Sequence, residues 1–274
     1  MHSADNSPTA AAGTAGFTQA PDVAYTNFLT ANGHTVTRIV ATAAPNVATL
    51  SGYDLVIIGR SNISANFQTN ESANAWNSIT APTIIMSAYL TRNSRLGFAT
   101  GANVPDTFIF NNSAVDSIRL KANNPLSPVF SGVPLDGTNT MTGNFASEIT
   151  FGLNVQRGIS IIADPLAPGA TILATVGFST AVADPGLNGV TIAEWNAGAT
   201  MSNPAASVLG GKRMVFLSGS REQVITSEAA GIFDLDADGQ RTFLNAVNYM
   251  AIPEPSALSL AGFGIIALLR RRRA

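Results

Sequence analysis

The chain has 274 residues; 46% are hydrophobic, only 12% are charged, and the net charge is −2. Four of the fifteen basic residues are consecutive arginines at the C-terminus, and without them 11 basic residues face 17 acidic ones, a net charge of −6. A body this acidic lacks the positive surface that nucleic acid requires. The absence of cysteine excludes disulfides, thiolate metal sites and a cysteine nucleophile.

The first half of the chain alternates helix and strand patterns. Residues 22–32 predict a helix, with Asp22 as N-cap and Gly33 as its C-terminal stop. Strands are then expected at "HTVTRIV" (34–40), "YDLVIIGRS" (53–61) and "APTIIMSAYL" (81–90), with a helix at "ESANAWNSIT" (71–80). This alternation favours a parallel α/β sheet.

The first helix of this series has no strand ahead of it. We therefore expect residues 1–20 to be an irregular loop following a strand that lies upstream of Met1, as would a signal peptide. Without that strand, we expect a gap or an unpaired edge beside residues 34–40 or residues 53–61.

The second half predicts short strands and a closing helix. A connection rich in proline and glycine (123–141) precedes short strands, expected to be antiparallel, at residues 157–164, 170–177 and 190–196. "GKRMVFLSGS" (211–220) is the last buried strand. The closing helix, residues 238–250, is expected to bury one apolar face formed by Phe243, Leu244, Val247 and Met250.

Residues 21–251 resemble the class I glutamine-amidotransferase-like fold. The resemblance rests on "NFLTANGHTVT", "GYDLVIIGRS", the apolar strand before Ser87, and "GKRMVFLSGS" leading into the closing helix. It implies a flavodoxin-like α/β sandwich with a mostly parallel sheet and inserted antiparallel strands, followed by a C-terminal apolar helix.

A ligand cleft is expected beyond the carboxyl ends of the strands, where open α/β sheets bind ligands. The residues at those ends are Arg60, Ser61, Ser87, Tyr89, Ser218, Ser220 and Arg221. The resemblance implies a nucleophile near Ser87, but the family uses cysteine there and a histidine after the last strand, and this chain has neither. The candidates that remain are Ser87 and Glu222, and the alternative is that Ser87 is a structural hydroxyl that caps the turn.

Two functions therefore stay open for the domain: a non-catalytic binding or structural module, or a degenerate hydrolase acting on carbohydrate or amide substrates. No cofactor is expected. Asp234, Asp236 and Asp238 match the first half of a calcium-binding EF-hand loop, but the twelfth position is Asn245 rather than glutamate. The alternative is that Asp236 or Asp238 caps the closing helix.

The last residues, 252–274, combine three features in a fixed order. Pro253, Glu254 and Pro255 forbid helix and leave an extended stretch; an apolar run follows at residues 257–269, and then Arg270, Arg271, Arg272 and Arg273. The apolar run is short for a transmembrane helix, which needs about 20 residues, so it is a marginal span; a buried or amphipathic C-terminal helix is the alternative.

This three-part tail resembles the PEP-CTERM sorting signal of Gram-negative bacteria. The resemblance implies an exosortase as partner, transient residence in the inner membrane through residues 257–269, and removal of the tail. It also implies a final location at the cell surface or in the extracellular matrix, with exopolysaccharide as a further possible partner.

Overall fold

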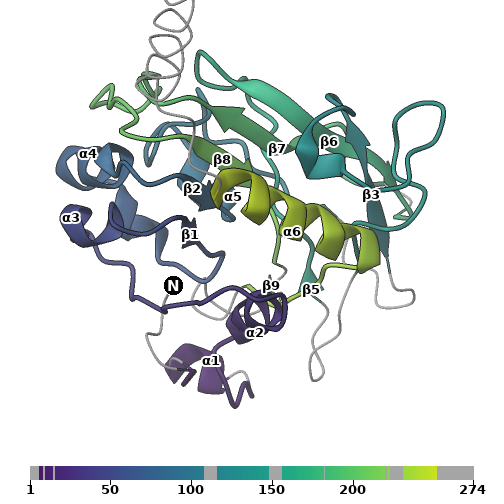
Figure 1. Ribbon diagram of the computed structural model, residues 1–274, viewed down its shortest axis with the longest axis horizontal. Coiled ribbons are helices and arrows are strands. Elements are labelled where there is room, and N and C mark those ends of the chain that lie inside the picture. The colour runs from purple at the N-terminus through teal and green to yellow at the C-terminus, as the bar shows by residue number, and fades with distance from the viewer. Residues whose placement is uncertain are drawn as a thin grey trace, which may run out of the picture.

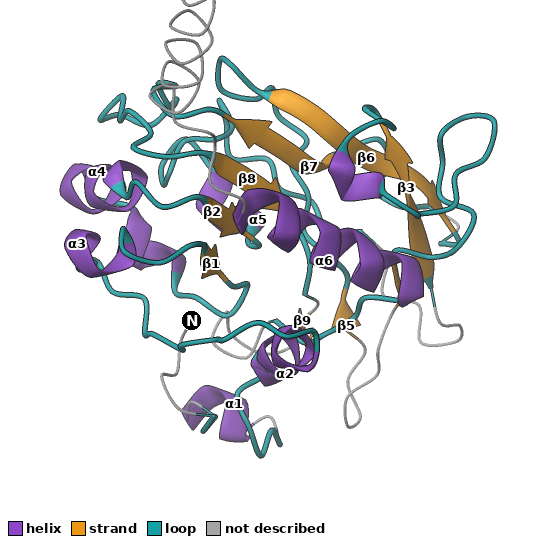
Figure 2. Ribbon diagram, in the orientation of Figure 1, coloured by secondary structure: helices purple, strands orange, loops and turns teal. Residues whose placement is uncertain are grey.

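The computed structural model describes residues 6–8, 10–14, 16–107, 116–147, 156–181, 183–219, 221–222 and 231–251. Within them the fold is mixed α/β, with a seven-stranded sheet and a separate ladder of β5 and β9 (Figures 1 and 2). In sheet order, the seven strands are β1 (Val56–Ile58), β2 (Thr83–Ile85), β8 (Arg213–Phe216), β7 (Val190–Trp195), β6 (Thr171–Ser179), β3 (Ser117–Ala122) and β4 (Ala146–Ser147). The ladder joins β5 (Gln156–Arg157) to β9 (Arg221–Glu222).

The described helices are α1 (Ala10–Thr14), α2 (Val23–Ala31), α3 (Val47–Leu50), α4 (Asn70–Ser78), α5 (Ala88–Thr91) and α6 (Ala237–Ala251), with 3-10 turns η1 (Ser64–Phe67) and η2 (Pro128–Phe130). Three helices, α2, α4 and α6, begin and end close to the expected positions, whereas α1, α3 and α5 were not expected, and α5 follows β2 where the strand 81–90 was predicted to continue. The short helix α1 lies inside the N-terminal segment that we expected to be irregular. In α6, Phe243, Val247 and Met250 are buried as expected, whereas Leu244 is only half-buried.

The expectation of a mostly parallel sheet is wrong. Only β1 with β2 and β2 with β8 pair in parallel; β8 with β7, β7 with β6, β6 with β3 and β3 with β4 are antiparallel. A parallel pair needs a crossover, which is usually a helix. Among the described residues no α-helix intervenes between β6, β7 and β8, so these strands pair antiparallel, as expected for residues 170–177 and 190–196.

Both faces of β8 are covered, as its continuous apolar sequence predicts. Phe216 packs against Phe243 of α6, with ring centroids 5.3 Å apart. Tyr25 of α2 also contacts Phe243, at 5.6 Å, so α2 and α6 lie on the same face of the sheet. Arg213, three residues before Phe216, points to the opposite face, where it bonds the carbonyls at the end of α4.

Two predicted strands do not form as strands. Residues 34–40 are extended but pair with no strand in the described chain, although they keep the alternation of a strand: His34, Val36 and Arg38 are half-buried, and the residues between them are exposed. The physical reason is the lack of a neighbour, because an extended segment becomes a strand only when another lies about 4.8 Å away. Of residues 157–164, only Arg157 lies in a strand, and single bridges form at Ser160 and Ile162.

Of the two residues predicted to end α2, Gly33 acts as expected and Asp22 does not. Gly33 has φ +88° directly after the C-cap Asn32, as expected for a glycine that ends a helix. Asp22 is at the N-cap but makes no capping bond; its carboxylate instead accepts a hydrogen bond from Arg38 at 2.7 Å. A charged guanidinium donor binds a carboxylate more strongly than a neutral backbone amide does.

The C-terminal apolar helix expected after α6 lies outside the described residues. Over the described ranges, no helix is both long enough and apolar enough to cross a membrane.

Candidate functional site

The strand ends expected to form a cleft do come together at one edge of the sheet. The amide of Ser218, after β8, reaches the carbonyl of Met86 at 3.5 Å, which places Ser218 beside Ser87 after β2. The guanidinium of Arg60, after β1, lies 4.8 Å from the ring centroid of Tyr89. We call Arg60, Ser61, Ser87, Tyr89 and Ser218 the strand-end cluster. Only Tyr89 is more than marginally accessible, since the exposed fraction of the other four does not exceed 3%.

One part of this cluster is closed by a hydrogen-bond network that the sequence did not indicate. The hydroxyl of Tyr25, from α2, contacts Ser218 Oγ and donates to Asp234 Oδ1 at 3.3 Å. The amide of Gly219 also donates to Asp234 Oδ1, at 3.2 Å. Burial first, and then the charge of Asp234, raise the pKa of Tyr25 well above its ordinary value. The network therefore holds α2 against the end of β8 with a neutral tyrosine.

A second part of the cluster places two arginines around one ring. The guanidinium carbons of Arg60 and Arg92 lie 4.8 and 4.3 Å from the Tyr89 ring centroid. Cations within about 6 Å of an aromatic face are attracted to it. Burial lowers the pKa of Arg92, although it stays protonated at neutral pH. Arg92, beside the strand-end cluster, thus adds a second positive charge next to the ring of Tyr89.

Ser87 is poorly placed for nucleophilic chemistry. Its side chain is 1% exposed, and in the described part of the chain its hydroxyl has no hydrogen-bond partner. Although Ser87 is the N-cap residue of α5, the hydroxyl makes no capping bond either. A serine hydroxyl needs an adjacent base to become a nucleophile.

Several predicted positions fall wholly or partly outside the described residues. Ser220 is one of them. Arg221 and Glu222 are described only as backbone, in β9, so a pairing of Ser87 with Glu222 stays a prediction. Residues 252–274, which include the complete sorting signal, also lie outside.

The three aspartates of the calcium hypothesis have separate protein partners. Asp234 accepts bonds from Tyr25 and Gly219, and the carboxylate of Asp236 accepts one from Ser147. Asp238 lies in the first turn of α6, where a negative charge is favourable. Over the described residues, no three acidic or histidine side chains gather in a way that could hold a metal ion.

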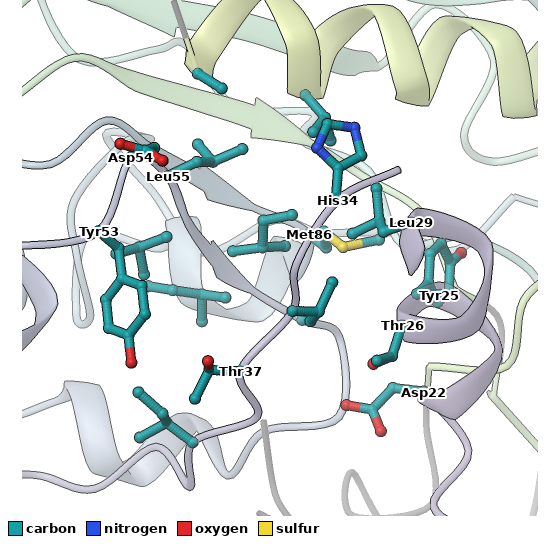
Figure 3. A pocket seen from close by; sticks show the side chains of 18 of the residues that line it. Asp22, Tyr25, Thr26, Leu29, His34, Thr37, Tyr53, Asp54, Leu55 and Met86 are labelled. Carbon is teal, nitrogen blue, oxygen red and sulfur yellow. The ribbon is translucent and has the colours of Figure 1, made fainter. Parts of the chain in front are cut away.

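A cavity of about 430 Å³ lies beside the strand-end cluster, between α2 and β1 (Figure 3). Tyr25 and Leu29 of α2 line one side, Tyr53 and Leu55 line the other, and Met86 lies between them. Gly33, the extended residues 34–37 and residues 39–41 also line it, with apolar groups from α4 and α6. Its lining is mostly apolar, which sets it apart from the polar cluster beside it.

The comparisons with known proteins identify the class of the tail. Residues 251–273 match the family model described as the PEP-CTERM protein-sorting motif. The chain therefore carries the sorting signal of an exported protein that is transiently anchored in a membrane and processed by an exosortase.

For the domain itself the comparisons give much less. No curated protein matches the chain. Among solved structures, the chain is similar to one titled "mmIFT52 N-terminal domain", with 10% identity, a TM-score of 0.41, and coverage of 85% of this chain and 90% of that one. A likeness this weak leaves the amidotransferase-like resemblance as a prediction.

Proposed function

We propose that this is an exported protein that an exosortase cleaves at its C-terminal tail and that reaches the surface or extracellular matrix of a Gram-negative bacterium. There its α/β domain acts as a non-catalytic binding or structural module. The observation that carries the proposal is the sorting motif at residues 251–273. The domain would present its ligand, for which exopolysaccharide is the candidate class, outside the cell.

The strand-end cluster supports the non-catalytic half of the proposal. Ser87 is buried and has no base beside it among the described residues, whereas Tyr25, Ser218 and Asp234 satisfy one another. We also propose that the domain is a diverged amidotransferase-like scaffold. The parallel strands β1, β2 and β8, and the placement of α2 and α6 on one face, support this.

The sorting half is tested with a fusion. Residues 252–274 are attached to an exported reporter and expressed in a host that has an exosortase. The parent tail is expected to be removed and the reporter released, because the enzyme needs the extended Pro-Glu-Pro stretch next to the membrane. With Pro253, Glu254 and Pro255 all changed to alanine, the reporter should stay uncut in the membrane fraction.

Ile252→Ala, next to the Pro-Glu-Pro stretch but outside it, is the matched control and should be processed as the parent is. Equal release of the triple-alanine variant would contradict the sorting proposal. The non-catalytic half is tested separately with a panel of esters, amides and glycosides. Turnover that Ser87→Ala abolishes, while the melting temperature is unchanged, would assign the domain to hydrolysis instead.

A further inference from the structure

The cavity shown in Figure 3 borders the edge of β1 that pairs with no strand among the described residues. Within the described chain, β1 pairs with β2 alone. Val56 and Ile58 of β1 form their backbone hydrogen bonds on the β2 side. The amide of Val56 donates to the carbonyl of Pro82, and the carbonyl of Ile58 accepts from the amide of Met86. In a parallel ladder the residue between them points its amide and carbonyl the other way. The peptide groups of Ile57 therefore face the cavity.

The opposite wall is an extended segment that runs in the same direction as β1. Residues 34–40 begin at the turn after α2. Beyond their far end, the carbonyl of Ala41 accepts a bond from Asn66, in the turn that follows β1. Arg38 is held by Asp22, which itself lies close to Gly59 at the carboxyl end of β1. The last residues of the segment thus lie near the carboxyl end of β1, as expected for two strands separated by one missing parallel strand.

The two faces of this space are already covered by apolar side chains. Leu29, Phe243 and Val247 come from α2 and α6, and Leu50 and Trp76 come from α3 and α4, which follow 34–40 and β1 in the chain. Cover on both faces is the environment of a buried parallel strand.

The same space leaves large apolar side chains accessible to solvent. Ile39, Val40 and Tyr53 line it and are 36%, 41% and 36% exposed. An apolar strand in this space would remove part of that surface from water, which is stabilising by about 25 cal/mol per Å². We call the space between residues 34–40 and β1 the strand slot.

We propose that the strand slot is filled by an apolar β-strand that directly precedes residue 1 in the full-length polypeptide. A parallel strand in the slot must leave it at the carboxyl end of β1. The described chain leads back to that place: the amide of Ala20 donates to the carbonyl of Asn6 at 2.9 Å, and Asp22 follows two residues later beside Gly59. Asn6 and Ala20 thus lie together near the exit of the slot.

The test adds a strand of known sequence to the 274-residue protein. The segment Thr-Val-Ile-Val-Val-Thr is placed ahead of Met1, followed by a short glycine-serine linker. We expect a higher melting temperature and about tenfold slower amide exchange at Ile57, because the added strand would bond its peptide groups. The control fusion, Thr-Val-Pro-Val-Pro-Thr, cannot donate a complete ladder and should give neither effect.

A second pair of variants tests the place of binding. Ile39→Asp changes an exposed residue of the slot, so the protein without a fused strand should keep its stability while the gain from the fusion disappears. Leu126→Asp, at a side chain that is 92% exposed and outside the slot, should keep the gain.

Three outcomes would overturn the proposal. The first is an equal effect of both fusions, or unchanged exchange at Ile57. The second is protection of Ile57 in the unfused protein that grows with concentration, which would assign the slot to a second copy. The third is a stop codon immediately before Met1 in the encoding DNA, in place of an in-frame apolar, β-branched segment.

Discussion

Arg213 is the residue whose surroundings differ most from what its type suggests. It is 1% exposed and its guanidinium donates to the carbonyls of Asn77, Ile79, Ala81 and Lys212 at 2.5–3.1 Å. Two of these carbonyls, those of Asn77 and Ile79, are at the C-terminal end of α4, where a helix leaves its last acceptors unpaired. Burial lowers the pKa of Arg213 to about 10, so the side chain is still charged at neutral pH.

Arg213→Met should therefore lower the free energy of unfolding by about 3 kcal/mol or more, because several buried carbonyls lose a charged donor at once. Arg213→Lys should recover only part of this lost stability, since a single ammonium group cannot reach all the carbonyls that the forked guanidinium contacts. Urea denaturation measures both. Lys121→Met, at an exposed position of β3, serves as the control and should change stability by less than about 0.5 kcal/mol.

Tyr25 provides a prediction with a pH dependence. An unfolded tyrosine loses its proton near pH 10, and the pKa of native Tyr25 is well above that. Above about pH 10 the unfolded chain therefore releases a proton that the native protein keeps, so this contribution to stability is complete below pH 10 and falls as the pH rises.

Tyr25→Phe should cost about 1–2 kcal/mol at pH 7 through the lost bonds to Ser218 and Asp234. The stability difference between the parent and Tyr25→Phe should then shrink between about pH 10 and 11, because the variant has no phenol to titrate. Urea titrations at matched pH values give this difference. A gap of constant size across that range would contradict the assignment.

At the scale of elements, the local patterns were the reliable ones. α2, α4 and α6, and the strands β2, β7 and β8, could be predicted because each carries its own periodicity or a continuous buried run, such as Ile84–Ile85. Prediction from the sequence failed where an element depends on a distant partner: residues 34–40 have the composition of a strand but pair with no strand in the part of the chain that the structure describes. The Tyr25–Asp234 bond, which joins residues 209 positions apart, left no local signal either.

In the candidate site, too, features set by local sequence could be predicted and features set by distant contacts could not. That Arg60, Ser87 and Ser218 share one edge followed from the rule that parallel strand ends align, and the structure has them there. Whether a ligand binds them stays a prediction. The ring of Tyr89 between two arginines depends on side-chain directions that no spacing in the sequence specifies.

A matched pair of glycines tests the end of α2. An added methyl group at Gly33 or at Gly13 would meet no atom within 4 Å, but only Gly33 has a positive φ, +88°. Gly33→Ala should destabilise the protein by about 1 kcal/mol through backbone strain, whereas Gly13→Ala, within α1, should be neutral or slightly stabilising. Thermal unfolding compares the two, and an equal effect of both substitutions would refute the strain argument.

At the scale of the whole molecule, processing should change the charge. The chain carries −2, and loss of the four terminal arginines leaves 11 basic and 17 acidic residues, or −6. Isoelectric focusing of the released and the membrane-held forms should therefore show the released form as the more acidic one. Release by nonspecific shedding of the intact chain would leave the two forms at the same isoelectric point.

The position of β8 in the sheet has a consequence for the order of events during synthesis. β8 is the central link: Thr83 of β2 pairs with Arg213, and Ile192 of β7 pairs with Phe216. Before residue 216 of 274 has emerged, β1 and β2 are two three-residue strands with nothing to join them to the antiparallel half. Contacts this distant in sequence form slowly. A polypeptide emerging from its N-terminus thus cannot complete the seven-stranded sheet until its last quarter is available, so export before that point would move a chain whose two halves are not yet joined.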